Sequence, residues 1–278
     1  MKIDFFIINY LSDNVLIQYL ESIKASSDLI READLCIYVI DNSLKDDLAF
    51  KDFCERVLEV FPSCNVHNSK RNLGYFGGIE FAKTLVRDDV SFVIYSNPDM
   101  VMHEDFFTQL MFANSDAIIA PSIQSIDFKN QLNPFVSNRS LMFIKLLFLQ
   151  IVTSNTLLFQ MYKDLSWLKT KFKLTPSPTH LSVGVNTKIY APHGSIFIFP
   201  RIFFMQMPFY PCFLYGEELF VAEEALRKTV NVFFYPKIKL FSINSVSISQ
   251  ISSRAATEFL HKSNRYILTK YFLLKRVD

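Results

Sequence analysis

Val90-Ser91-Phe92-Val93-Ile94-Tyr95-Ser96-Asn97-Pro98-Asp99 is the stretch that decides the fold. Its apolar part predicts a buried strand, because short apolar runs bounded by turn residues are typical of strands covered on both faces. Oxygen-bearing side chains then follow the strand, and Mg²⁺ and Mn²⁺ take oxygen ligands that they share with substrate phosphates. Ligands collect at the carboxyl ends of strands in open α/β sheets. The stretch therefore indicates a phosphate-bearing substrate held through a metal, although an Asn-Pro-Asp turn also occurs without any function.

Strands and helices alternate around this segment. Apolar, β-branched runs predict strands at residues 3–9, 35–40, 65–67 and 195–199. Apolar positions spaced by three to four predict helices over residues 13–23, 50–61 and 79–86. This alternation predicts an α/β fold with a Rossmann-like, mostly parallel central sheet flanked by helices.

Two later segments allow more than one interpretation. Residues 141–161 are apolar and just long enough to span a membrane, but seven polar side chains make spanning costly and favour a buried or interfacial helix pair. Residues 259–276 mix aromatic and basic side chains. They form a C-terminal helical extension that either lies on an anionic membrane surface or docks on the domain with a solvated basic face.

Composition narrows the class of protein. The 278 residues are half apolar, with 29 Phe, which suits one large domain or two small ones with a sizeable core. A formal net charge of +2 argues against a nucleic-acid binder. The four cysteines show no CxxC spacing, and the first residues do not resemble a signal peptide. We therefore expect a reducing, cytoplasmic location.

Glycine and polar residues mark the remaining candidate sites. Three of the six glycines fall within Gly74-Tyr75-Phe76-Gly77-Gly78, where backbone can approach a ligand and a helix follows. The loop is neither a Walker loop nor a dinucleotide fingerprint. Arg71, just before it, could reach a phosphate. Asp41-Asn42-Ser43 ends the second strand and would suit a base or ribose, or simply a turn.

Two clusters lie in the second half of the chain. Glu217-Glu218 follows an aromatic run, where carboxyl pKa values can rise as a general base requires, but these residues could also charge the first turn of a helix. His193-Gly194-Ser195 precedes a strand, and His193 could contact an acceptor or satisfy a turn.

In order and spacing, these motifs resemble the family 2 nucleotide-sugar glycosyltransferases, which have the GT-A fold. The resemblance covers about residues 1–250 and rests on six motifs: Ile7-Ile8-Asn9-Tyr10, Val39-Ile40-Asp41-Asn42-Ser43, Asn72-Leu73-Gly74-Tyr75-Phe76-Gly77-Gly78, Asn97-Pro98-Asp99, His193-Gly194-Ser195 and Phe213-Leu214-Tyr215-Gly216-Glu217-Glu218.

The resemblance implies a role for each matching residue. Asp99 would be the main ligand of a divalent Mn²⁺ or Mg²⁺ ion, and Asn97 would assist it directly or through water. Glu218 would be the catalytic base, with Glu217 as its alternative. Asp41 would contact the nucleotide base or ribose. The other implied substrate-binding residues are Asn9, Asn42, Arg71, Asn72, Gly74, Gly77, Gly78, Asn97, His193 and Gly194.

The implied reaction is sugar transfer with inversion from a nucleotide-sugar donor to a saccharide or lipid-linked acceptor. The implied pathway is bacterial surface polysaccharide assembly at the inner face of the cell membrane, with possible peripheral membrane contact. Residues 1–120 would form the nucleotide-sugar-binding half, residues 121–250 the acceptor-binding and catalytic half of the same domain, and residues 251–278 the amphipathic C-terminal segment.

One departure from the family pattern supports a competing hypothesis. Many relatives have a metal-binding His after the position of Pro236, whereas residues 237–249 contain none and Ser242 stands in its place. The alternative is a degenerate, non-catalytic subunit that binds nucleotide sugars. A nucleotidyltransferase is disfavoured, because Asn9-Tyr10-Leu11-Ser12 is not the basic, Gly-rich loop that such enzymes carry after the first strand.

Overall fold

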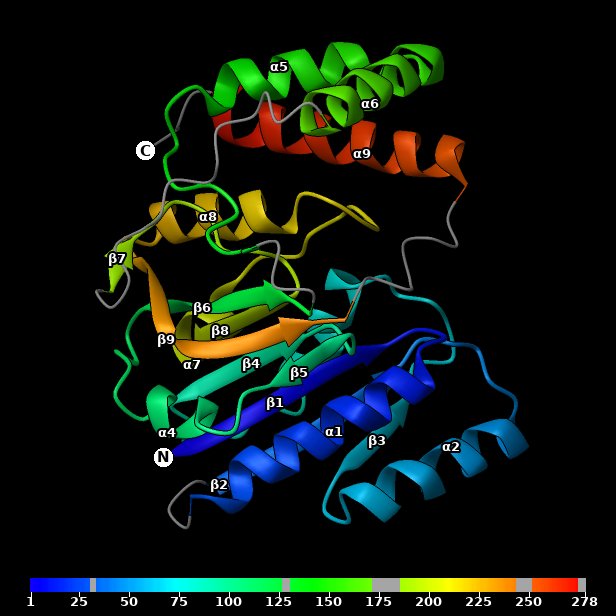
Figure 1. Cartoon of the computed structure of the whole chain (residues 1–278), viewed down its shortest axis with the longest axis vertical. Coiled ribbons are helices and arrows are strands. Elements are labelled where there is room, and N and C mark those ends of the chain that lie inside the picture. The colour runs from blue at the N-terminus through cyan, green and yellow to red at the C-terminus, as the bar shows by residue number, and fades with distance from the viewer. Residues whose placement is uncertain (31–33, 127–130, 172–185, 244–251, 275–278) are drawn as a thin grey trace.

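One mixed β-sheet forms the centre of the molecule (Figure 1). The structure, a computed structural model, describes residues 1–30, 34–126, 131–171, 186–243 and 252–274. The strands lie in the order β3-β2-β1-β4-β8-β6-β9-β5, and β7 also pairs with β9. The first half of the chain and the second half therefore contribute to one continuous sheet.

The four strands β3 (Asn65–Asn68), β2 (Asp34–Asp41), β1 (Lys2–Asn9) and β4 (Phe92–Ser96) are parallel. In register, Asn9 pairs with Asp41 and Ile7 pairs with Ser96. The carboxyl ends of β1, β2 and β4 consequently meet at one edge of the sheet. The polar residues that follow these strands are brought together there, as the sequence predicts.

The other half of the sheet is mixed. Strand β8 (Ile196–Pro200) is antiparallel to β4 and to β6 (Ile118–Ser125), whereas β6 is parallel to β9 (Val232–Ser242). The short strands β5 (Met100–Met102) and β7 (Thr187–Lys188) are antiparallel to β9. The predicted α/β fold with flanking helices and a C-terminal helix is confirmed, and its parallel part is concentrated in β1 to β4.

Helices cover both faces of the sheet (Figure 1). Along β1, Phe5 and Ile7 pack into one core and Phe6 and Ile8 into the other, so the strand is buried on both sides. The first core is closed by α1 (Asp13–Asp28), α2 (Asp47–Val60) and α4 (Phe106–Leu110). The second is closed by η1 (Phe76–Gly78), α3 (Ile79–Lys83), α7 (Arg201–Gln206) and α8 (Glu217–Arg227).

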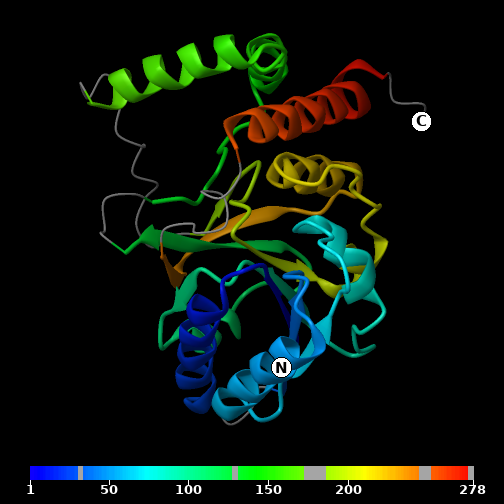
Figure 2. The ribbon, with the colours of Figure 1, turned by 90° about the vertical axis from the view of Figure 1, so that its right-hand side faces the viewer.

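A third layer of helices lies over α8 (Figure 2). It consists of α5 (Met142–Val152), α6 (Thr156–Lys171) and α9 (Ser253–Leu268), which continues into a π-helical turn, Thr269–Leu273. Ile267 and Leu268 of α9 are buried in the same core as α8. Residues 141–161 thus belong to a helix pair, and none of the described helices is both long and apolar enough to cross a bilayer.

Candidate active site

A cavity of about 530 Å³ opens at the carboxyl ends of β1, β2 and β4, beside the start of α8. It collects nine of the residues that the sequence analysis singles out: Asn42, Asn72, Gly74, Asn97, Asp99, His193, Gly194, Glu217 and Glu218. Five others, Asn9, Asp41, Arg71, Gly77 and Gly78, do not line it. The motifs therefore converge in space, although Asn42 and Glu218 lie far apart in the sequence.

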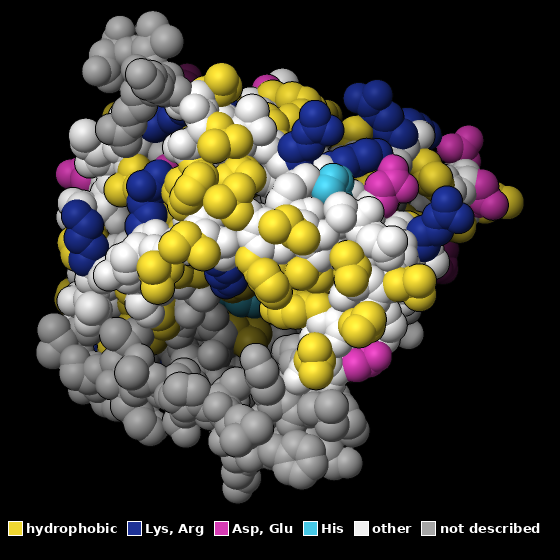
Figure 3. Space-filling view, turned by 90° about the horizontal axis from the view of Figure 1, so that it is seen from above, with side chains coloured by type: hydrophobic (Ala, Val, Ile, Leu, Met, Phe, Trp, Pro, Cys, Tyr) yellow, Lys and Arg dark blue, Asp and Glu magenta, His cyan; other side chains and the backbone are white. Residues whose placement is uncertain are grey.

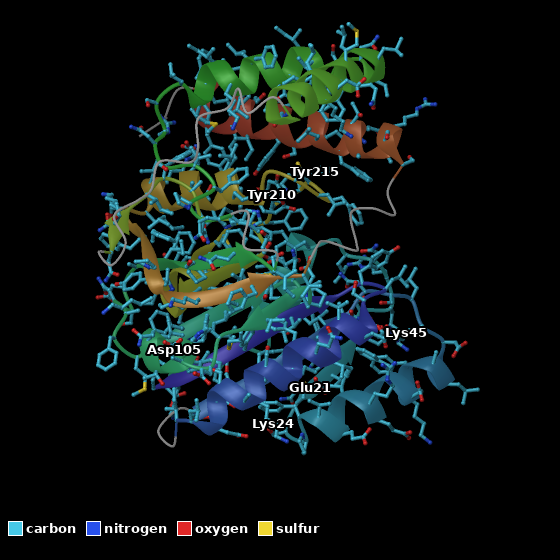
Figure 4. All side chains as sticks on the ribbon, in the orientation of Figure 1. Glu21, Lys24, Lys45, Asp105, Tyr210 and Tyr215 are labelled. Carbon is cyan, nitrogen blue, oxygen red and sulfur yellow. The ribbon has the colours of Figure 1, made fainter. Side chains whose placement is uncertain are left out.

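Another hollow, of about 350 Å³, lies on the outer surface of α1 and α2, with Glu21 and Lys24 in its lining (Figure 4). Its charged lining side chains are exposed, so no buried polar groups converge there. The cavity beside α8 is the better candidate, because convergent buried polar groups in an apolar pocket are typical of active sites.

Asp41 is held by neighbours within the fold. Its fully buried carboxylate accepts hydrogen bonds from Asn9 Nδ2 at 2.8 Å and from Lys45 Nζ at 3.0 Å. Lys45, labelled in Figure 4, also pairs with Asp13 at 3.0 Å. The next residue, Asn42, reaches the cavity instead, and its Oδ1 is buried with no hydrogen-bond partner among the described residues. The ligand contacts assigned to Asn9 and Asp41 stay predictions.

The glycine loop is shaped by close packing. Gly74 has a φ of +70°, and a Cβ there would lie 2.5 Å from the carbonyl oxygen of Phe213. Gly78 lies against Tyr95, whose hydroxyl would be 2.8 Å from an added Cβ. Arg71 is exposed and outside the cavity lining. Gly74 therefore brings backbone to the cavity wall, whereas Gly78 allows the loop to pack on the sheet.

Asp99 is the carboxylate at the sheet edge. Its side chain is 8% exposed, and its Oδ1 has no hydrogen-bond partner in the part of the chain that the structure describes. Burial raises the pKa of the Asp99 carboxyl to about 6. A buried carboxylate oxygen without a partner costs free energy, so Asp99 is a candidate to bind a group that supplies the missing contact.

The surroundings of Asp99 fit a metal that is shared with a substrate. Ile243 N donates a hydrogen bond to the Asp99 carbonyl oxygen at 3.0 Å, which holds the end of β9 beside it, and Ser242 lines the cavity. The described residues contain no cluster of three or more His, Cys, Asp or Glu side chains that could hold a metal by themselves. Asp99 fits an ion such as Mn²⁺ or Mg²⁺ only if phosphate and water complete the shell, as is usual for Mg²⁺.

Glu217 and Glu218 begin α8 after a strained turn. Tyr215 and Gly216 both have positive φ values, +68° and +82°. The Tyr215 carbonyl oxygen accepts hydrogen bonds from the Tyr210 hydroxyl at 2.5 Å and from Ser263 Oγ of α9 at 2.7 Å. Figure 4 shows Tyr210 and Tyr215 close together beside α8. We call Tyr210, Tyr215, Gly216 and Ser263 the α8 turn clamp. It fixes the direction in which the two glutamates enter the cavity.

Burial shifts the pKa values of both glutamates upward. Desolvation, followed by the charge of Glu218, raises the pKa of the Glu217 carboxyl to about 8. Desolvation also raises the pKa of Glu218, partly offset by hydrogen bonds from its own backbone and that of Gly194. At neutral pH burial therefore favours the protonated form of Glu217. Carboxyls whose pKa values are raised by burial are a common feature of catalytic sites.

His193-Gly194-Ser195 forms the part of the cavity wall next to Glu218. A Cβ at Gly194 would lie 2.7 Å from Oε1 of Glu218, so glycine leaves room for the carboxylate. Burial lowers the pKa of His193 to about 4, which keeps the imidazole neutral. Its Nδ1 accepts a hydrogen bond from Ser195 N at 3.2 Å, and its backbone N donates one to Asn133 Oδ1 at 2.7 Å.

The raised pKa of Glu217 predicts how stability depends on pH. The folded state keeps the Glu217 proton up to about pH 8, whereas the ordinary value is 4.5. Stability from this group is thus complete below pH 4.5 and is lost as the pH rises toward 8, by at most about 1.4 kcal/mol per pH unit. Urea unfolding at several pH values should give a shallower decline for Glu217→Gln than for the wild type. Equal slopes would contradict the shift.

The sequence analysis missed part of the cavity wall. Apolar and aromatic side chains of Tyr10, Phe213, Leu214 and Phe259 also line it. Phe259 comes from α9, and its ring packs against Phe213 with a centroid distance of 5.3 Å. Tyr10, Phe213 and Leu214 lie inside the quoted motifs, so their position could have drawn attention. Nothing in the sequence around Phe259 indicates that a C-terminal helix contributes to this site.

Solved structures of other proteins have a similar architecture. No protein-family model matches the chain, and no curated protein matches its sequence. The structure of GalNAc-T7 with UDP, GalNAc and Mn²⁺ matches with a TM-score of 0.55 at 12% identity, over 89% of this chain. The mannosyltransferase PcManGT from Pyrobaculum calidifontis, in complex with GDP-Man and Mn²⁺, matches with a TM-score of 0.54 at 12% identity. The fold is GT-A.

These matches differ in extent. The alignment covers 96% of this chain and 72% of PcManGT, but only 44% of GalNAc-T7, so this chain spans less than half of the latter protein. At 12% identity the likeness establishes the fold alone. What the chain does must be argued from the cavity.

Proposed function

We propose that the protein is a glycosyltransferase that moves a sugar from a nucleoside-diphosphate sugar to an acceptor hydroxyl with inversion. The observation that carries this proposal is the presence, in one cavity, of a buried Asp99 oxygen without a described partner, the buried Glu217 and the half-buried Glu218. The same fold occurs in GalNAc-T7 and PcManGT, whose structures contain nucleotide or nucleotide sugar and Mn²⁺.

The sheet edge would hold the donor. Asn42 offers a buried amide oxygen that could accept a hydrogen bond from a base, and its Nδ2 donates to the Gly74 carbonyl oxygen at 3.1 Å, which holds the amide in place. Asp99, assisted by Asn97, would bind Mn²⁺ or Mg²⁺. When bound, such an ion supplies positive charge that stabilises a departing diphosphate.

Glu218 would be the catalytic base. Its carboxylate lines the cavity beside Gly194, and burial raises its pKa above the ordinary value, as a general base requires. It would take the proton from the acceptor hydroxyl, whose oxygen then forms the new bond to the anomeric carbon. The bond from that carbon to the diphosphate oxygen breaks on the opposite side, with the electron pair leaving on the diphosphate. A single displacement of this kind inverts the configuration.

The acceptor would lie against the apolar wall. Phe213, Leu214 and Phe259 suit the face of a sugar ring or the first carbons of a lipid-linked acceptor. A place in bacterial surface polysaccharide assembly, at the inner face of the cell membrane, is part of the same proposal and is motivated by the motif resemblance.

The donor side can be tested through Asp99. We expect Asp99→Asn to weaken Mn²⁺-dependent binding of the preferred nucleotide sugar at least tenfold, because the amide replaces the main charged ligand. Calorimetry with Mn²⁺ and a panel of nucleotide sugars measures this. Asp105→Asn is the matched control. Asp105 is labelled in Figure 4 near α4, pairs with His103 at 2.5 Å, and does not line the cavity.

A turnover assay distinguishes a transferase from the competing hypothesis of a non-catalytic binding subunit. Ser242 lines the cavity where relatives have a metal-binding His, which motivates a non-catalytic binding subunit. Residues 244–249, the rest of the segment that lacks His, lie outside the described residues. Donor binding without any release of nucleoside diphosphate, over a panel of acceptors, would favour the binding subunit over the transferase. Unchanged binding by Asp99→Asn would contradict the proposed donor site.

A further inference from the structure

The helix pair α5 and α6 carries an apolar surface that its own fold does not cover. Six side chains are 50–75% exposed: Ile144, Phe148, Ile151, Leu157, Met161 and Leu165. We call them the α5–α6 apolar surface. Their spacing places three along one side of each helix. The rings of Phe148 and Tyr162 lie 5.7 Å apart and connect the two helices. Figure 3 shows hydrophobic side chains gathered across this face.

The opposite side of α5 already serves the fold. Met142 and Leu146 are buried in the main core, about half a turn away from Ile144 and Phe148. The exposed apolar side is therefore additional to what α5 needs for packing. Folded proteins rarely leave a contiguous apolar patch of several hundred Å² in water unless it binds something.

Exposed basic side chains lie beside the α5–α6 apolar surface on α5 and α9. Helix α5 contains the exposed Lys145 and no acidic residue, whereas the exposed Lys163 of α6 lies on the side of that helix opposite Leu157 and Met161. The adjoining helix α9 exposes Arg254, Lys262 and Arg265. The acidic side chains described nearby are Asp164 and Glu258, and Glu258 is paired with Lys262 at 2.7 Å. An apolar surface with a cationic rim complements an anionic lipid headgroup layer. A second copy of the chain would instead bring like charges together.

The length of α5 indicates that this helix could lie on a bilayer but could not cross it. Helix α5 has 11 residues, a length of about 16 Å, whereas the hydrocarbon core is about 30 Å thick. Helix α9 is a weaker candidate than the sequence suggests, because Ile267 and Leu268 on its apolar side are buried within the protein. Residues 275–278 of the predicted C-terminal segment lie outside the described residues.

We propose that α5 and α6 dock the protein on an anionic lipid surface, with the α5–α6 apolar surface inserted among the headgroups and Lys145 beside lipid phosphates. The proposal does not depend on sugar transfer. It assigns membrane contact to a helix pair in the middle of the chain, and leaves α9 to contribute only its exposed basic side chains.

The test compares two triple variants. Ile144→Ser/Ile151→Ser/Leu157→Ser removes three exposed apolar side chains from the proposed surface. Leu48→Ser/Phe112→Ser/Ile202→Ser removes three from other parts of the chain that are at least as exposed, at 82%, 82% and 67%. Sedimentation with vesicles of phosphatidylcholine containing phosphatidylglycerol should show wild-type binding. The first variant should lose at least about tenfold in partitioning, and the control should lose little.

Further measurements show whether this surface binds an anionic membrane or a second copy of the chain. Vesicles of phosphatidylcholine alone should bind the wild type at least about tenfold more weakly, because the rim then lacks anionic partners. The proposal is overturned by absent vesicle binding, by equal loss in both triple variants, or by a dimer in sedimentation equilibrium that the first variant abolishes. No donor is present in these measurements, so their failure is distinct from failure of the proposed sugar transfer.

Discussion

Replacing Glu218 by Gln should lower kcat for sugar transfer by about a hundredfold to ten-thousandfold, the usual contribution of a positioned general base. The amide keeps the size of the side chain beside Gly194 but cannot accept the proton of the acceptor hydroxyl. Release of nucleoside diphosphate from the donor, measured with saturating donor and a panel of acceptors, gives kcat directly.

Glu217→Gln is the internal control for this result. Its neutral side chain resembles the protonated Glu217 that burial favours at neutral pH, so we expect kcat within about tenfold of the wild type. Glu80→Gln, on the exposed side of α3, should have no effect. If Glu217→Gln loses activity and Glu218→Gln keeps it, the two assigned roles are reversed. Full activity in both variants would exclude either carboxylate as the base.

Gly216→Ala should have the largest effect on stability. Its φ of +82° costs an L-residue about 1–2 kcal/mol, and an added Cβ would overlap Ser263 Oγ and the Tyr210 hydroxyl. Overpacking adds roughly 1–3 kcal/mol. Urea unfolding should therefore show a loss of about 2–5 kcal/mol, and kcat should fall as well because the turn positions Glu217 and Glu218.

Two further variants distinguish backbone strain from steric overlap as causes of this loss of stability. Gly77→Ala has no positive φ, and its Cβ would approach only Leu73 Cβ at 3.3 Å, so stability should change by less than about 1 kcal/mol. Adding Ser263→Ala to Gly216→Ala removes one overlapping atom and should restore part of the loss, whereas the backbone strain remains. A Gly216→Ala protein as stable as the wild type would contradict the described α8 turn clamp.

Local patterns in the sequence predict much of the first half of the fold. Uninterrupted apolar runs identify β1, β2 and β4, and parallel pairing follows from the helices between them. The same reasoning predicts that the residues after β2 and β4, Asn42 and Asp99 among them, meet at one edge, and both line the cavity. Asn72 is implied by the motif resemblance and lines the cavity as well. Apolar patterns are sufficient to predict these strands because helices that are close in the sequence cover both faces of each strand.

Contacts between segments that are distant in the sequence cannot be predicted from such local patterns. Asp41 is engaged by Lys45, a pairing set by the path of the loop after β2 and not by any motif. Phe259 reaches the cavity wall only because α9 returns over α8. The burial of Ile267 and Leu268 likewise depends on tertiary packing, which a helix with both apolar and basic residues does not reveal.

The hydrogen bond from Ser263 to Tyr215 has a consequence for the order in which the protein matures during synthesis. The described sheet is complete once β9 has emerged, yet the turn before Glu217 and Glu218 still lacks one of its two hydrogen-bond donors. The wall formed by Phe259 is missing at the same stage. A nascent chain ending before α9 would thus have the central sheet without a finished cavity, and the proposed sugar transfer would require the last helix to fold into place.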